Sequence, residues 1–135
     1  MPEPFLDTNV ILRHLLQDHT DLSPRAHAIM ERIERGELTV RLSDIVVFET
    51  VFVLQRVYRI PRDEIAGAVL RLLELPTIIL PEKQQYRDVF AQYQSSGGDF
   101  ADCFHAILME RLGLNEIISF DRDFDRLPGI TRREE

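Results

Sequence analysis

The sequence has little of several features that define other classes of protein. It contains one cysteine, Cys103, so no disulfide can form within its 135 residues, and a disulfide-stapled secreted domain is excluded. Asp7 and Arg13 interrupt the apolar N-terminal stretch, which has no basic segment before it, so neither a signal peptide nor a membrane span is expected. We therefore expect a cytoplasmic protein with no membrane partner.

Lysine is almost absent as well. Lys83 is the single lysine among 16 basic residues, and the rest are arginines, whose planar guanidinium suits phosphate but is equally favoured by a GC-rich genome. The net charge of −7 argues against a large basic face for nucleic acid. No Walker A or dinucleotide-binding motif occurs, no pair among the four histidines has zinc spacing, and one cysteine cannot build a structural zinc site.

Apolar spacing predicts strands that alternate with helices along the whole chain. Strands are expected at 5–6, 38–42, 77–80, 116–120 and 130–131, and helices at 10–16, 23–36, 43–57, 65–73, 86–93 and 100–112. Ser23 and Ser43 suit helix N-caps, and Ser95–Gly98 suits a loop. Strands separated by helices pair in parallel, so we predict one α/β domain over residues 1–135. Its architecture would be a three-layer sandwich with a central, mainly parallel four- to five-stranded sheet.

Four carboxylates stand where such a fold could gather them. Asp7 and Asp121 each follow a short apolar run, Glu49 lies inside another, and Asp102 follows a Gly-Gly pair near the start of a predicted helix. Ligands of open α/β sheets bind at the carboxyl ends of the strands, and hard divalent cations prefer carboxylate oxygen. The pattern therefore predicts a site for divalent cations.

Glu49 is the most informative of these acids. It is the only charged residue between Asp44 and Arg56. Burial of a lone carboxylate costs several kcal/mol unless a cation or hydrogen bonds compensate, so we expect a buried Glu49 with a partner nearby. That partner would be a bound cation or an arginine; alternatively, Glu49 lies on a helix stripe that reaches the surface.

The remaining acids have ordinary explanations too. Asp99 and Asp102 suit the N-cap and first turn of a helix, although their i, i+3 spacing also lets both reach one cation. Asp121, Asp123 and Asp125 alternate as in a calcium loop, but the glycine and distal glutamate of an EF-hand are missing. An EF-hand is excluded.

Cysteine chemistry is also disfavoured. Cys103 and His105 are two residues apart on a predicted helix and point in different directions. A nucleophile and its base would have to face each other. We therefore expect Cys103 to be buried as part of the packing.

Taken together, the motifs resemble those of the PIN-domain nucleases, and more closely of their bacterial and archaeal VapC-like toxins, over essentially the whole chain. The residues 5–9 resemble the opening strand-aspartate motif, and Glu49 resembles the helical glutamate. Residues 101–106 resemble the D-x-x-x-A helix, and residues 119–124 resemble the T/S-x-D-x-D-F ending.

The resemblance implies a metal-dependent endoribonuclease that cleaves single-stranded or structured RNA through metal-activated water, as the toxin of a type II toxin–antitoxin pair. It also implies a homodimer and a cognate antitoxin that blocks the acidic pocket. The cofactor would be Mg²⁺ or Mn²⁺, one or two ions. The implied catalytic acids and metal ligands are Asp7, Glu49, Asp102 and Asp121, with Asp99 as a fifth ligand and Thr8, Asn9 and Ser119 orienting them by hydrogen bonds.

Three alternatives stay open. A HAD-like phosphatase would use Asp7 as a nucleophile, but Asn9 replaces the usual second aspartate. A receiver-type phosphotransfer domain would need a lysine near its last strand, whereas Lys83 precedes a helix. A non-catalytic PIN scaffold that binds partners would normally have lost acids, and this chain keeps them.

Overall fold

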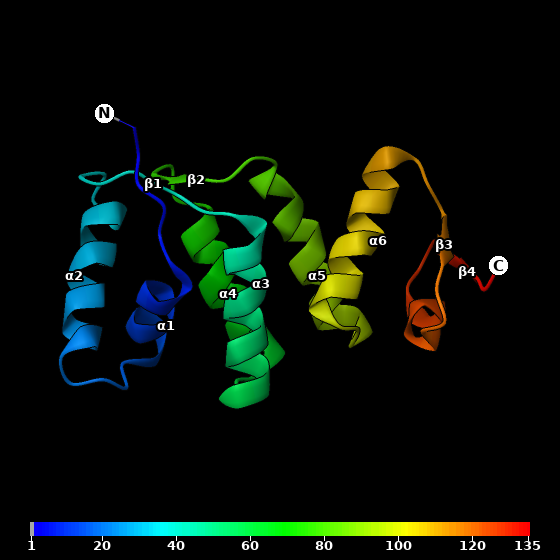
Figure 1. Cartoon of the computed structure of the whole chain (residues 1–135), viewed down its shortest axis with the longest axis horizontal. Helices are drawn as coiled ribbons and strands as arrows, with labels where there is room; N and C mark the ends of the chain where they lie inside the picture. Colours follow the sequence, from blue (N-terminus) through cyan, green and yellow to red (C-terminus); the bar gives the residue numbers. More distant parts are fainter. Residues whose placement is uncertain (1) are drawn as a thin grey trace. The chain divides into compact units, whose positions relative to one another are not determined.

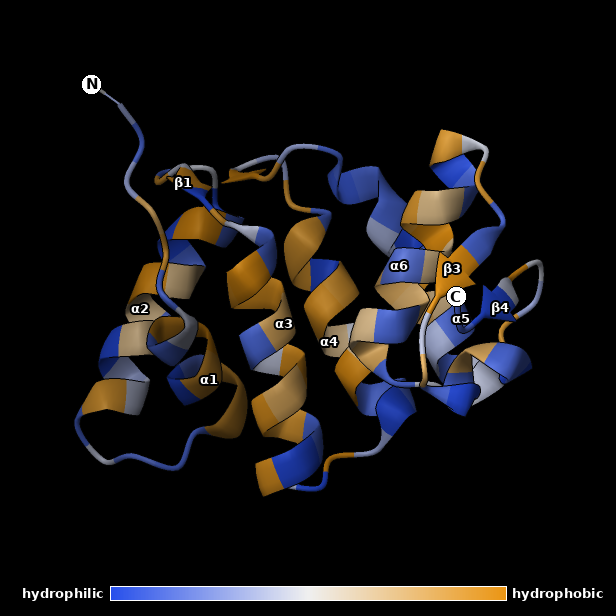
Figure 2. Cartoon of the chain, turned by 45° about the vertical axis from the view of Figure 1, so that its right-hand side comes forward, coloured by the Kyte–Doolittle hydropathy of each residue, from blue (hydrophilic) through white to orange (hydrophobic). Residues whose placement is uncertain are grey.

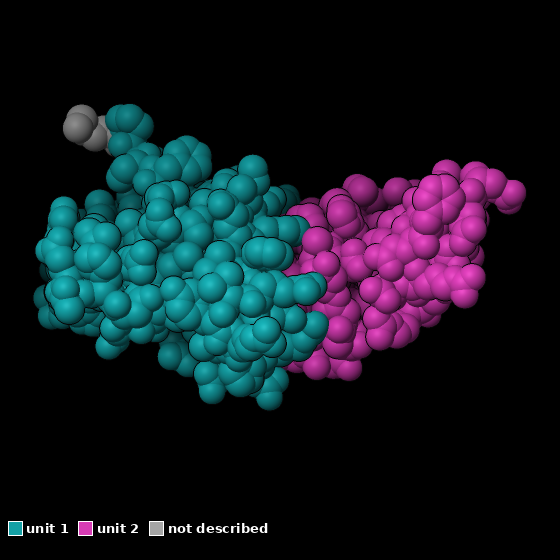
Figure 3. Space-filling model, turned by 60° about the horizontal axis from the view of Figure 1, so that its bottom comes forward, with its two compact units in different colours: residues 1–83 teal, residues 84–135 magenta. Residues whose placement is uncertain are grey.

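The computed structural model describes residues 2–135. The chain divides into two compact units, Met1–Lys83 and Gln84–Glu135 (Figure 3). Each unit has its own helices, its own short parallel sheet and its own buried core. Within the described residues, no helix is both long enough and apolar enough to cross a membrane.

The first unit combines helices with a short sheet (Figure 1). Its elements are α1 (Thr8–Leu16), α2 (Leu22–Glu34), β1 (Val40–Arg41), α3 (Asp44–Phe52), α4 (Arg62–Leu73) and β2 (Ile78–Ile79), with a π-helical turn at Val53–Val57 after α3. The two strands pair in parallel, and Phe5 adds a parallel bridge to Arg41. Arg41 bonds to the segment around Phe5, while its neighbours Val40 and Leu42 donate to the β2 segment, so β1 lies between the two.

Two helix starts in this unit were predicted from serines, and one prediction is confirmed. Ser43 precedes α3, and its Oγ accepts a hydrogen bond from the Val46 N–H at 3.3 Å. Ser23 was predicted to cap α2, which is wrong because that helix already begins at Leu22. His19 takes the capping role instead: its Nδ1 accepts from the Leu22 N–H at 2.9 Å, while Ser23 Oγ accepts from the His19 N–H at 3.1 Å.

The sole lysine has a structural position. Lys83 Nζ donates to the carbonyl oxygens of Leu75 and Ile78, at 2.8 and 2.7 Å. Burial lowers the pKa of this amine, and the nearby Glu74 opposes that shift. Lys83 therefore joins the segment after α4 to the start of β2, and two of its three ammonium protons are donated there.

The second unit contains α5 (Tyr86–Ser96), α6 (Phe100–Leu112), β3 (Glu116–Ile118) and β4 (Thr131–Arg133), and its two strands pair in parallel. Aromatic rings from α5 and α6 form its core. The Phe100 ring lies 4.9 Å from that of Phe90 and 5.5 Å from that of Tyr93, between ring centroids. Cys103 is fully buried, as predicted.

The α/β class and the parallel pairing are confirmed, because every strand pair among the described residues is parallel. The strands are shorter than predicted and form two two-stranded sheets, β1-β2 and β3-β4. The expected strand at 5–6 is reduced to the single bridge from Phe5. The expected loop at Ser95–Gly98 starts later, because α5 continues to Ser96, whose Oγ donates to the Gln92 carbonyl at 2.6 Å.

Candidate metal-binding site

The first group of predicted site residues lies where the N-terminal segment turns into α1. Asp7 occupies the N-cap position with extended backbone, φ −84° and ψ 153°. Its side chain is exposed and makes no capping hydrogen bond to any residue in the described range. A carboxylate at a helix N-terminus is favoured by the helix dipole. The oxygens of Asp7 are therefore held in a favourable field and are open to a ligand.

Thr8 connects this helix start to α3. Its side chain is 7% exposed, and its Oγ1 donates a hydrogen bond to Glu49 Oε1 at 3.2 Å, across 41 residues of sequence. A hydroxyl has one proton, so Thr8 donates to only one of the two carboxylate oxygens of Glu49. The structure thus brings Glu49 to the residue next to Asp7, while the neighbouring Asn9 is exposed.

The prediction that Glu49 is buried is wrong, since its side chain is exposed. The buried side of α3 and the following turn has helical spacing and consists of Val47, Thr50, Val51 and Leu54. Glu49 lies on the other side with the exposed Ile45 and Phe52, so apolar residues occur on both faces. Figure 2 shows mostly apolar colours along α3. The alternative that Glu49 lies on a helix stripe that reaches the surface is therefore confirmed. Glu49 forms no ion pair with the described residues of its own unit.

In the second unit, Asp99 and Asp102 lie at the start of α6. Asp99 is at the N-cap position, but only its backbone carbonyl serves the helix, accepting from the Cys103 N–H at 3.0 Å. Its carboxylate makes no capping bond to the described residues, so the capping explanation for this side chain is wrong. Asp102 is half-buried in the first turn. The Asp99 carboxylate is therefore not used as a hydrogen-bonding cap within the described residues.

Asp121 follows β3 and begins a 3-10 turn, Arg122–Arg126. Its N–H donates to Ser119 Oγ at 3.0 Å, and its Oδ1 accepts from the Asp123 N–H at 2.9 Å. Asp123 in turn pairs with Arg126, at 2.8 Å between Oδ1 and Nη2. Ser119 thus fixes the backbone of Asp121, and one carboxylate oxygen of Asp121 is oriented by the turn.

The acids of the second unit act on one another electrostatically. Burial raises the pKa of Asp102, the negative charges of Asp99, Asp121 and Asp123 raise it further, and His105 opposes the shift. Asp123 was not among the predicted site residues. Its signal in the sequence was the D-x-D spacing with Asp121, which was considered as part of a calcium loop and of the T/S-x-D-x-D-F ending, but Asp123 itself was given no role in the site.

The donor set fits a hard cation. Asp7, Thr8 and Glu49 in one unit, and Asp99, Asp102 and Asp121 in the other, offer oxygen atoms, which Mg²⁺ and Mn²⁺ prefer. Mutual repulsion around Asp102 is the condition that a bound cation relieves. Within either unit, no three His, Cys, Asp or Glu side chains of the described residues are grouped closely enough to hold an ion. Each unit therefore carries part of the predicted ligand set.

Parallel strands, flanking helices and carboxylates at the starts of helices define an α/β protein with the donors of a hard-cation site. The sequence profile of the PIN domain matches residues 5–130, so the chain belongs to the PIN-domain family. It is also 26% identical over 122 residues to a VapC ribonuclease of Aquifex aeolicus (strain VF5), an alignment that covers 90% of each chain. Membership of this family removes the HAD-like and receiver-type alternatives.

Proposed function

We propose that this protein is a metal-dependent endoribonuclease and the toxin of a type II toxin–antitoxin pair. The observation that carries the proposal is the full set of acids in a chain whose relative is a VapC ribonuclease. The exposed Asp7 and Glu49 support it further, because Thr8, next to Asp7, bonds to Glu49 and neither carboxylate forms an ion pair with the described residues of its unit. The alternative is a PIN scaffold that binds partners without catalysis.

The proposed ligands of one or two Mg²⁺ or Mn²⁺ ions are Asp7, Glu49, Asp99, Asp102 and Asp121. Such ions, when bound, activate water and stabilise the leaving oxygen of a phosphodiester. Thr8 holds Glu49 in one orientation by its hydrogen bond, and Ser119 holds the backbone of Asp121. Asn9, exposed next to Thr8 in the sequence, is proposed to orient a neighbouring group by hydrogen bonds. No protein side chain is required as the nucleophile.

The proposed substrate is single-stranded or structured RNA. A chain with a net charge of −7 repels phosphate, so binding of RNA should depend on the metal as well as on the arginines. The proposed partners are a cognate antitoxin and a second copy of the chain, and the proposed compartment is the cytoplasm, where RNA substrates are present. The proposed domain is single, covers residues 1–135 and has the layers of a three-layer sandwich, although its strands form two short sheets.

Binding of Mn²⁺ by isothermal titration tests the ligand set. Asp7→Asn and Asp121→Asn should each weaken binding, because each replaces an anionic oxygen of a hard-cation site by a neutral amide. Asp88→Asn is the matched control, since Asp88 is an exposed acid on α5 outside the proposed site. Unchanged affinity in both site variants would refute the ligand assignment.

Cleavage products test the reaction. Metal-activated water leaves a 5′-phosphate and a 3′-hydroxyl, whereas attack by the RNA 2′-hydroxyl leaves a 2′,3′-cyclic phosphate. We expect the first pair of ends, loss of cleavage with EDTA, and loss of cleavage in Asp7→Asn. Cyclic phosphate ends would overturn the mechanism, and absence of cleavage with either metal across a panel of structured RNAs would favour the scaffold alternative.

A further inference from the structure

Two histidines that are 13 residues apart face each other across the first two helices. His14 lies in the last turn of α1 and His27 in the second turn of α2. Their Nδ1 atoms are 3.4 Å apart, and the ring planes are inclined by only 22° with centroids 5.3 Å apart. Neither residue belongs to the carboxylate site, and no other part of the proposed nuclease function uses them.

This separation is the one that two ligands of a tetrahedral metal ion require. Zinc–nitrogen bonds of about 2.0–2.1 Å at a tetrahedral angle place the two nitrogen atoms roughly 3.3–3.4 Å apart. A plain hydrogen bond between imidazoles also accommodates 3.4 Å, but it is long for that purpose, since N–H bonds to acceptors centre near 2.9–3.0 Å. The rings are therefore already spaced as neighbouring ligands of one ion.

The surroundings of His14 keep its imidazole available to a metal. Burial lowers the pKa of His14, and His27 lowers it further, against the opposite effect of Glu34. A neutral imidazole has the free lone pair that a metal ion needs. Glu34 also adds favourable negative charge, while Arg71 of α4, which lines an open cavity with His14 and Glu34, opposes a cation.

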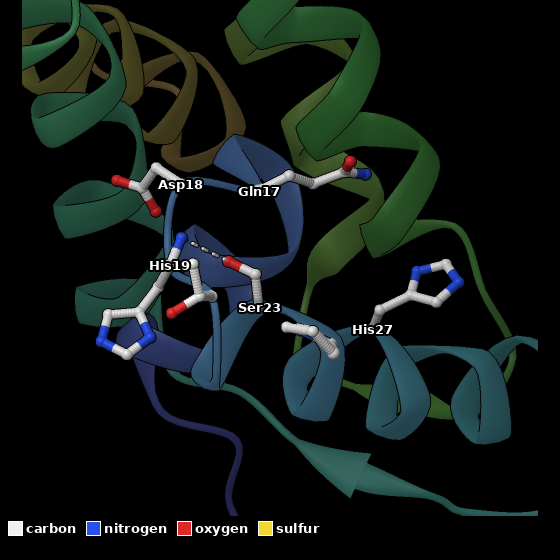
Figure 4. A pocket seen from close by; sticks show the side chains of 7 residues that line it. Gln17, Asp18, His19, Ser23 and His27 are labelled. Atoms are coloured by element: carbon white, nitrogen blue, oxygen red, sulfur yellow. Dashed lines mark hydrogen bonds between the residues drawn. The ribbon is translucent and has the colours of Figure 1, made fainter.

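An ion can reach the pair from solvent. His27 is exposed and borders an open cavity of about 540 Å³ lined by Gln17, Asp18, His19, Thr20, Ser23 and Pro24. Figure 4 shows that the ring of His19 lies at the opposite end of this cavity from that of His27. His19 is also occupied by its hydrogen bond with the N–H of Leu22. It therefore serves as the matched control for the pair.

We propose that His14 and His27 bind one divalent transition-metal ion of the Zn²⁺ type through their Nδ1 atoms, with water completing the coordination. No zinc spacing occurs among the histidines in the sequence, because two ligands on one helix would be three or four residues apart. Here the packing of α1 on α2 supplies the proximity instead. The bound ion would tie the C-terminal end of α1, whose first residues are next to Asp7, to α2 and so stabilise the first unit.

The test is a titration of the metal-free full-length chain with Zn²⁺. Excess Mg²⁺ is present throughout, so that the oxygen ligands of the carboxylate site are occupied by Mg²⁺. We expect one site whose affinity falls roughly tenfold or more in His14→Gln and in His27→Gln, because even loss of an outer-shell partner typically costs 10–100-fold. His19→Gln should bind like the wild type. Unchanged affinity in both pair variants, or no Zn²⁺ binding in excess Mg²⁺, would overturn the proposal.

A second measurement covers the case in which a variant folds poorly. Cu²⁺ added to the wild type should show electron paramagnetic resonance splitting from two imidazole nitrogens, and His27→Gln, at an exposed position, should show one. Zn²⁺ should also raise the melting temperature of the wild type in a concentration-dependent manner, and this rise should vanish in His27→Gln. Splitting from a single nitrogen in the wild type would refute the pair.

Discussion

The hydrogen bond from Thr8 to Glu49 allows a test in which stability and activity separate. Thr8→Val keeps the shape of the side chain but removes the hydroxyl, whereas Thr8→Ser keeps the hydroxyl but removes a methyl group. Hydrogen bonds to charged groups contribute about 1.5–3 kcal/mol, and the exposure of Glu49 places this bond at or below the lower end. Loss of one buried methyl costs about 0.8 kcal/mol. The two variants should thus be destabilised by similar amounts, about 1 kcal/mol each.

Activity should differ between them. Thr8→Val leaves Glu49 without its orienting donor, so Mn²⁺ affinity and RNA cleavage should fall roughly 10–100-fold, as for other outer-shell partners of metal ligands. Thr8→Ser should cleave RNA at nearly the wild-type rate. Urea unfolding without metal measures the free energy of unfolding of each variant. Mn²⁺ titration and single-turnover cleavage measure metal affinity and activity. Equal activity of the two variants would show that Thr8 is only a packing residue and would refute the positioning role.

The raised pKa of Asp102 and the Ser43 cap of α3 each allow one more test. Asp102→Asn should stabilise the metal-free protein at pH values above 3.8, the ordinary carboxyl pKa. Because the pKa of Asp102 is raised in the folded protein, the carboxyl group ionises at lower pH in the unfolded chain. The stability of the wild type therefore falls as the pH rises through 3.8 towards the folded pKa. Urea midpoints with EDTA at several pH values measure this, and an amide variant that is less stable across that range would contradict the repulsion around Asp102. Ser43→Ala should cost about 1 kcal/mol of unfolding free energy through loss of the α3 cap. It should leave Mn²⁺ affinity intact, and a large affinity loss would mean that this cap also positions Glu49.

Much of the fold could be predicted because the helices are well delimited. The segment at 100–112 is a helix with those bounds, and Gly113 ends it at φ +72°, a conformation that glycine adopts without strain. Strand ends were less predictable. The expected strand at 38–42 contains only Val40–Arg41, because backbone pairing with neighbours decides strand length, and apolar alternation does not report it.

The site residues were predictable by type and less so by environment. Glu49 was expected to be buried because its segment is almost wholly apolar. Burial depends on which side of the helix faces the core, and Ile45 and Phe52 are exposed on the same side as Glu49. When a helix is almost uniformly apolar, its sequence does not show which side faces the core. The His14 and His27 pair was equally hidden, since their proximity arises from packing of two helices and leaves no local spacing to read.

Lys83 has a consequence for covalent chemistry on the side chains. An amine-reactive acylating reagent has one side-chain target in these 135 residues, and acylation there replaces a triply donating ammonium by an amide with a single N–H. Only one of the two carbonyl oxygens of Leu75 and Ile78 could then keep its partner. Because burial also lowers the pKa of this amine, a larger fraction of it is nucleophilic at a given pH than for an exposed lysine. A single acyl group would therefore loosen the connection between α4 and β2 at one defined point.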